Sequence, residues 1–235
     1  AWVQDGSNGE ATVLNINFGQ RPFAYAPPSG FVTLNTFNLP TPTIGATAAE
    51  LANEYFNIAL YTGTGSSQSI TGLGFQPDWT WIKGRSGATD HGLYDAVRGV
   101  QNQLESNTTT AETAEATGLT AFGSDGFTVG ALAQLNTSSA TYVGWNWKAN
   151  GAGSANTAGT ITSTVSANTT AGFSVVTWTG NLTSGATVGH GLGAVPSMVI
   201  VKNRSVGSTN WCVYHISIGN TKADLLNRTD GPFTN

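Results

Sequence analysis

The chain has 235 residues, enough to bury a core in one or two domains, and its seven tryptophans exclude a disordered tail. Only 9% of the residues are charged, the net charge is −4, and the nine lysines and arginines are scattered singly, so no basic stripe exists to bind nucleic acid. The single cysteine, Cys212, excludes an intrachain disulfide and a thiolate metal cluster, and no run of about 18 apolar residues could span a membrane.

A surface with so few charges, made soluble by Ser, Thr, Asn and Gly, favours a protein that packs among copies of itself. A secreted, neutral β protein is the alternative. No signal peptide is visible, and because the sequence begins at Ala1 instead of Met, we expect a processed chain or a fragment.

Residues 1–43 differ in pattern from the rest of the chain. The stretch 12–18 (TVLNINF) alternates apolar and polar residues, which predicts a half-buried strand, and 38–42 (NLPTP) is typical of an extended linker. The next segment, 46–55 (ATAAELANEY), is predicted to form a helix of two or three turns. Thr47 would cap this helix, and Glu50 would complete a capping box.

From residue 56 onward the chain contains one unit twice. Residues 72–85 (GLGFQPDWTWIKGR) recur as 191–204 (GLGAVPSMVIVKNR), at a spacing of 119 positions. The flanking matches are 56–63 (FNIALYTG) with 173–180 (FSVVTWTG), and 90–99 (DHGLYDAVRG) with 210–219 (NWCVYHISIG). A self-similar unit is one packing solution used twice. A residue found in a single copy is therefore not required by the shared fold.

The first copy is predicted to be rich in strands, at 56–62, 79–83, 126–130 and 140–148. In 79–83, Trp79 and Trp81 share a face. In 140–148 (ATYVGWNWK), one face holds Tyr142, Gly144, Asn146 and Lys148, and the other holds Val143, Trp145 and Trp147. Residues 93–100 fit a short helix or a strand equally well, and 106–118 is polar enough for a loop.

The second copy is predicted to be incomplete. Residues 159–165 (GTITSTV) can form a strand, and the repeat proper starts at Phe173. By the repeat spacing, it ends where the first copy had reached about Glu115, so the counterpart of 122–147 is missing. Either the chain is truncated, which we favour, or a neighbouring chain supplies those strands, because an open sheet edge recruits a partner.

These patterns predict an all-β fold of tandem antiparallel β-sandwich-like repeats with short helices. The expected organisation is an N-terminal part, 1–43, then repeat one, 44–150, then the incomplete repeat two, 151–235.

Asp90, His91 and Asp95 are the one close grouping of histidine and carboxylates. They suit a general acid–base pair or half a metal site. The second copy keeps none of them at the matching positions, so we favour a polar turn in which Asp90 caps the next element. We predict no catalytic residue, no cofactor and no metal site, and we retain Asp90 and His91 as candidate ligand or partner contacts.

Two further motifs are better explained by turns. His190 lies in a glycine-rich stretch, has Thr71 as its counterpart, and is accompanied by no Gly-x-Ser-x-Gly elbow. The Gly72-Leu73-Gly74 motif does not continue as a phosphate loop, so we expect a β-turn in which glycine supplies positive φ.

The tryptophans suggest carbohydrate binding, because aromatic faces stack on sugars, but a core role is the stronger interpretation for most of them. Trp79 and Trp81 align with Met198 and Ile200, which are apolar in both copies, as a core face requires. Trp2 and Trp211 have no apolar counterpart and are therefore candidate ligand or partner contacts.

Lys83 and Arg85 recur as Lys202 and Arg204, and they are the charges kept in both aligned segments. This conservation within one chain predicts a structural role, with a carboxylate or carbonyl partner at the end of the strand.

A family resemblance is carried by 13–25 (VLNINFGQRPFAY) and by 27–31 (PPSGF). This stretch resembles the final strands of SPRY-like β-sandwich domains in phage tail and virion proteins, in which NFGQRPF is followed by PPxGF. The repeats look like the β-rich modules that follow such a domain in large structural proteins of tailed phages. The matching signals are YTG at 61–63, GLGFQPD at 72–78, KGRS at 83–86 and DHGL at 90–93.

The resemblance implies a structural virion protein of a tailed phage, part of a tail fibre or surface appendage, and it transfers no catalytic motif. We expect it on the particle surface, assembled with copies of itself and other virion proteins, with a host glycan as a further contact and with no nucleic-acid partner or membrane insertion. The alternative is a bacterial extracellular carbohydrate-binding or surface fibre protein. A glycan hydrolase needs two facing carboxylates. It is disfavoured because Asp and Glu total only 13, and we expect no enzymatic activity.

Overall fold

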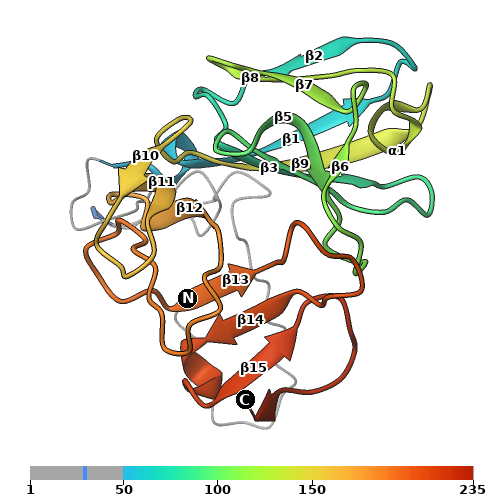
Figure 1. Ribbon diagram of the computed structural model, residues 1–235. Coiled ribbons are helices and arrows are strands. Elements are labelled where there is room, and N and C mark those ends of the chain that lie inside the picture. Colours follow the sequence, from blue (N-terminus) through green and yellow to red (C-terminus); the bar gives the residue numbers. More distant parts are fainter. Residues whose placement is uncertain (1–28, 31–49, 235) are drawn as a thin grey trace, which may run out of the picture. The chain divides into compact units, whose positions relative to one another are not determined.

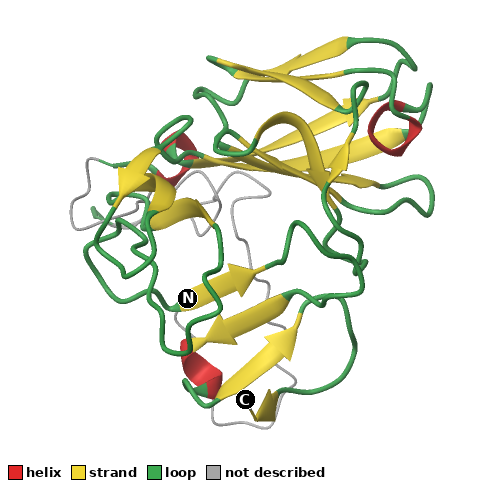
Figure 2. Ribbon diagram, viewed as in Figure 1, coloured by secondary structure: helices red, strands yellow, loops and turns green. Residues whose placement is uncertain are grey.

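The computed structural model describes residues 29–30 and 50–234 (Figures 1 and 2). Contacts divide the chain into two units, Ala1–Pro42 and Thr43–Asn235. Of the first unit, Ser29 and Gly30 are described, and they form an exposed turn. The predicted strand at 12–18, the linker at 38–42, Trp2 and Thr47 all lie outside the described residues.

The second unit is built from antiparallel sheets, as the all-β prediction requires. Its first repeat contains β1 (Phe56–Thr62), β2 (Gln68–Thr71), β3 (Trp79–Gly84), β4 (Gly92–Asp95), β5 (Gly99–Leu104), β6 (Thr113–Ala114), β7 (Leu119–Gly123), β8 (Gly126–Val129), α1 (Ala133–Asn136) and β9 (Thr141–Trp147). Six strands form one sheet in the order β1-β9-β3-β4-β5-β6, and three form a second in the order β2-β8-β7. Figure 2 shows the two sheets facing each other.

The core of the first repeat fills the space between these two sheets. Its buried apolar side chains come from both sheets, from α1 and from the turn before β3: Ala59, Ile70, Leu73, Phe75, Ile82, Tyr94, Leu119, Phe127, Val129, Leu135 and Tyr142. The strand β9 runs through the middle of the large sheet, between β1 and β3. Its two faces alternate as predicted, and the face of Tyr142, Gly144 and Asn146 is the one that is fully buried.

The second repeat is arranged like part of the first. It contains β10 (Ser154–Asn156), β11 (Ser163–Asn168), β12 (Phe173–Trp178), β13 (Met198–Val201), β14 (Cys212–His215), a 3-10 turn (Ile216–Ile218), β15 (Lys222–Leu225) and β16 (Phe233–Thr234). The order β13-β14-β15-β16 reproduces β3-β4-β5-β6. The shared glycines also match, because Gly72 and Gly74 have φ of 91° and 81° while Gly191 and Gly193 have 73° and 71°.

Three predicted elements differ in detail. Within the described part of 46–55, a single 3-10 turn, Ala52–Glu54, replaces the longer helix, because the Tyr55 carbonyl already accepts a hydrogen bond from the Lys148 amide (2.8 Å) and starts the sheet ladder. Residues 93–100 belong to the β4–β5 hairpin. The strand expected at 159–165 begins later, as β11, since Ile161 makes only an isolated bridge to Val188.

The two predicted repeats, 44–150 and 151–235, lie together in the second compact unit. A second apolar cluster joins them, in which Leu93, Leu104 and Trp211 are buried and Trp79, Trp81, Ile200 and Leu226 pack around them. Phe173 also stacks on Trp79, with ring centroids 5.6 Å apart. The Trp79 and Trp81 face predicted to be core therefore packs in this junction, while Thr80 and Ile82, on the opposite face, lie in the core of repeat one.

Candidate functional site

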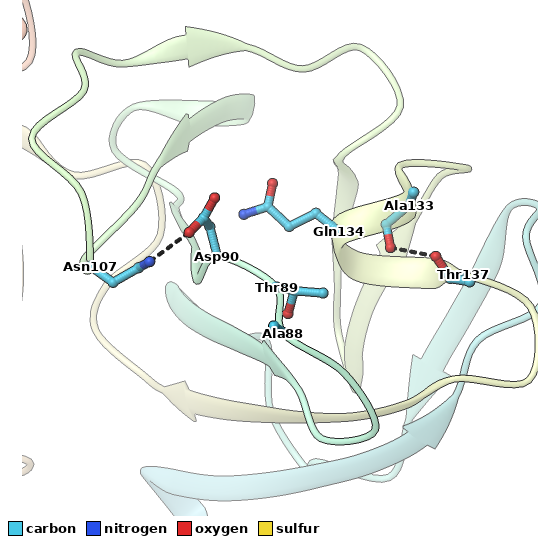
Figure 3. Close-up of a pocket in the computed structure, with 7 residues that line it drawn as sticks. All are labelled: Ala88, Thr89, Asp90, Asn107, Ala133, Gln134 and Thr137. Atoms are coloured by element: carbon cyan, nitrogen blue, oxygen red, sulfur yellow. Dashed lines mark hydrogen bonds between the residues drawn. The ribbon is translucent and has the colours of Figure 1, made fainter.

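A polar hollow of about 590 Å³ lies beside the predicted contact residue Asp90. It is lined by Ala88, Thr89, Asp90, Asn107, Ala133, Gln134 and Thr137. The loop between β3 and β4 supplies Asp90, and α1 supplies Gln134, whose amide points toward Asp90 in Figure 3. The Asn107 side-chain amide donates a hydrogen bond to Asp90 Oδ1 (2.6 Å), which fixes the carboxylate at the rim. Asp90 is therefore tied to Asn107 and does not cap β4.

The chemistry of this hollow suits hydrogen bonding to a neutral polar ligand. It presents one carboxylate, two side-chain amides and two hydroxyls, and it lacks a second carboxylate for acid–base catalysis across a cleft. Among the described residues, no group of three His, Cys, Asp or Glu side chains could hold a metal ion. Hydroxyl groups of a sugar would match such a lining, because side-chain amides donate to and accept from hydroxyls and a carboxylate accepts from them.

His91 is part of a structural pair with a tryptophan. The Trp81 indole Nε1 donates to His91 Nδ1 (2.6 Å), which places the ring proton on Nε2. Burial, together with the nearby Lys83 charge, lowers the pKa of His91, so the imidazole is neutral near pH 7. The His91 backbone amide donates to Asn107 Oδ1, so the same asparagine positions both predicted contact residues.

Asp95 belongs to a buried ion network. It pairs with Arg98, and both side chains are about 5% exposed or less. Arg98 also pairs with Glu112 (2.8 Å), and Glu112 in turn binds Arg204 of the second repeat through both carboxylate oxygens (2.7 and 2.9 Å). The Asp90, His91 and Asp95 grouping seen in the sequence is thus divided between the hollow and the junction.

Acid should weaken the junction through Glu112. Burial by itself raises the pKa of this carboxyl, but hydrogen bonds from Arg204 and Arg98 outweigh it, and the pKa lies below its usual 4.5. The unfolded chain then binds the proton more readily, so the stabilisation is present above about pH 4.5 and is lost as the pH falls through the folded-state pKa. Urea unfolding at a series of pH values should give a weaker pH dependence for Glu112→Gln than for the natural chain. Equal slopes would contradict this assignment.

Trp211, which was predicted as a ligand or partner contact, lies in the interior. It is 5% exposed, and its indole Nε1 donates to the Glu105 carbonyl of the first repeat (2.8 Å). Trp211 of the second repeat packs against Leu93 and Leu104 of the first repeat. Only one of the two copies can make this contact, so the first copy has no apolar residue at the matching position. The comparison of copies correctly marked it as unusual but could not indicate what it contacts.

The lysines kept in both copies have the structural role that was predicted. Lys83 Nζ donates to the carbonyl of Gly84 (3.1 Å), and Lys202 Nζ donates to the carbonyl of Asn203 (2.9 Å). Each also reaches a threonine hydroxyl, that of Thr89 or Thr209. The arginines differ, because Arg204 binds Glu112 across the junction whereas Arg85 is exposed.

Sequence reasoning missed two polar residues that shape the first repeat. Asp125 accepts hydrogen bonds from the amides of Gly72 (3.0 Å) and Gly74 (2.6 Å), and these bonds lower the pKa of its carboxyl. Gln134 lines the hollow from a four-residue helix that the sequence did not predict. The Ser124-Asp125-Gly126 turn signal was available for the first residue, but no local pattern joins it to a turn some fifty residues earlier.

No helix among the described residues is long and apolar enough to cross a membrane.

Comparison with known proteins gives one match. No curated protein and no solved structure matches the chain significantly. The model of a family described as a domain of unknown function, DUF7483, matches residues 52–235, which include both repeats. The chain therefore belongs to the DUF7483 family.

Proposed function

We propose that the chain is a structural protein of a tailed-phage particle, part of a fibre or surface appendage that assembles with copies of itself. The observation that carries the structural role is the use of its carboxylates. Asp78 accepts from the Ala149 amide (2.7 Å) and from Gln76 (2.9 Å), Asp95 and Glu112 bind Arg98, and Asp125 holds a glycine turn. These groups hold the fold together instead of facing a reaction cleft.

The assignment to a phage particle rests on the resemblance of 13–31 and of the repeat motifs to virion proteins. The low charge, 9% of residues, supports assembly because few charges must be desolvated when faces meet. The junction between the repeats combines ion pairs with apolar contacts, and it fixes one repeat against the next. This fixed arrangement supports a role as a rigid spacer in a fibre.

Light scattering and negative-stain microscopy of the purified chain test this function. We expect a discrete oligomer or fibre, and antibodies raised against the chain should label appendages of phage particles that encode it. A chain that stays monomeric at high concentration and labels no particle would overturn the proposal.

A second candidate function, glycan contact, is favoured by the hollow beside Asp90. On a glycan array, Asp90→Asn and Gln134→Ala should each weaken binding by about tenfold, the loss expected from one or two hydrogen bonds. Asp230→Asn, on the exposed pair with Arg228, is the matched control. Binding that survives both hollow variants would exclude this site.

A further inference from the structure

The loop between β5 and β6 joins the hollow beside Asp90 to the second repeat. This loop, residues 105–112, which we call the bridging loop, supplies Asn107 to the lining of the hollow. The same loop makes a hydrogen bond and an ion pair with residues of the second repeat. The position of the bridging loop therefore affects both the hollow and the junction.

The second repeat holds the bridging loop at its first and its last residue. The indole Nε1 of the buried Trp211 donates to the carbonyl of Glu105 (2.8 Å). At the other end, the backbone amide of Glu112 donates to the Arg204 carbonyl (2.9 Å), and the Arg204 guanidinium binds both carboxylate oxygens of Glu112 (2.7 and 2.9 Å). These contacts remove conformational freedom that a surface loop would otherwise have.

The bridging loop sets the acceptor side of the hollow through Asn107. Its side-chain Nδ2 donates to Asp90 Oδ1 (2.6 Å), and its Oδ1 accepts from the His91 backbone amide (2.9 Å). Asp90 is exposed, so packing contributes little to fixing its carboxylate. The direction in which Asp90 presents its second oxygen to a ligand therefore depends on Asn107.

The donor side of the hollow is set through Glu105. Gln134 Oε1 accepts from the Gln103 amide (2.9 Å), and Gln134 Nε2 donates to the Glu105 carboxylate (3.4 Å). Gln103 is 2% exposed, and its own Oε1 accepts from the hydroxyl of the fully buried Tyr94, so its orientation is fixed from the interior. These bonds leave the amide nitrogen of Gln134 on the side of Asp90, as Figure 3 shows.

We propose that the second repeat is a working part of the hollow in the first repeat. By anchoring the bridging loop, Trp211 and Arg204 act as positioning residues for a site whose ligand they do not touch. The ligand must accept from Gln134 and donate to Asp90 at once, which adjacent hydroxyl groups of a sugar can do. The identity of the ligand rests on the glycan contact proposed above, whereas the positioning follows from the contacts of the loop.

Loss of an anchor should weaken ligand binding without any change in the lining of the hollow. When the loop samples several positions, only the fraction with Glu105 and Asn107 in place binds, and the apparent Kd rises by the inverse of that fraction. Trp211→Phe keeps an aromatic ring in the junction but removes the N–H that holds Glu105. On the glycan array it should weaken binding by roughly two- to tenfold, the effect of one lost hydrogen bond.

NMR spectra of the chain without ligand report the positioning directly. The side-chain amide signals of Asn107 and Gln134 should lie away from those of exposed amides, because both groups are hydrogen-bonded. Their loss in Asn107→Asp and in Gln134→Glu assigns them. In Trp211→Phe both signals should move toward the values of exposed amides.

A second anchor variant and a matched control complete the test. Arg204→Gln releases the far end of the bridging loop and removes no core side chain, since Arg204 is 39% exposed, and it should move the signals in the same direction. Val213→Ala truncates a buried side chain of β14 outside the junction cluster, so it should lower stability and move neither signal. Unchanged signals in both anchor variants, or equal shifts in Val213→Ala, would overturn the proposal.

The two readouts separate this inference from the glycan contact. If the natural chain binds no glycan on the array, the glycan contact and the ligand assigned here both fail, while the amide signals still decide whether the second repeat positions the hollow. Binding that is lost in Asp90→Asn but kept at full strength in Trp211→Phe and Arg204→Gln would support the glycan contact and overturn the positioning role.

Discussion

Replacing Arg98 by methionine should lower the free energy of unfolding by about 3–5 kcal/mol, because it leaves the buried Asp95 carboxylate without its partner and removes one of the two arginines that bind Glu112. The Arg98 side chain is 4% exposed and pairs with Asp95 and Glu112. Its remaining guanidinium hydrogens donate to the carbonyls of Leu93 (3.0 Å) and Asn102 (2.9 Å), so methionine would also leave backbone acceptors unpaired. Urea unfolding followed by circular dichroism measures the loss.

The matched control is Arg228→Met. Arg228 pairs with Asp230, but both side chains are more than half exposed, so this substitution should change stability by about 0–1 kcal/mol. If Arg98→Met and Arg228→Met had equal effects, the buried network would not stabilise the fold in the way inferred from its geometry.

The same leucine-to-alanine change should have unequal effects in the two repeats. Leu73→Ala removes a side chain from the closed core and should cost about 2–5 kcal/mol, the range for buried leucines that leave a cavity. Leu192→Ala, at the half-buried matching position of the second repeat, should cost roughly 1 kcal/mol or less. Unfolding curves of the two variants make the comparison directly, since residue type and local turn are identical.

Equal costs of the two substitutions would contradict the difference in burial between Leu73 and Leu192.

Local patterns gave four of the nine strands of the first repeat, β1, β3, β8 and β9. The alternation in 140–148 identified β9 and the two faces of its side chains, and Gly72 and Gly74 were recognised as turn residues that need positive φ. In the described residues 50–55 the predicted helix is a single 3-10 turn, because the Tyr55 carbonyl already takes part in pairing β1 with a strand some ninety residues away. Propensity was overridden there by a contact that no local window contains.

The candidate site was less accessible to sequence reasoning. Asp90 was selected, but Gln134, across the hollow, lies on an element that was not predicted. Asp95 was grouped with His91 by spacing alone, whereas the β4–β5 hairpin turns it toward Arg98. Trp211 was selected for lacking a counterpart, and its burial in the junction follows from the packing of the two repeats.

By itself the sequence determined that one β-rich unit occurs twice and where several of its strands and its shared glycine turns fall. The tertiary structure alone decided which face of each strand is buried. Alternation defines two faces of a strand, but burial depends on what lies against each one. Here the cover comes from residues 119–147 in one repeat and, among the described residues, from no equivalent segment in the other.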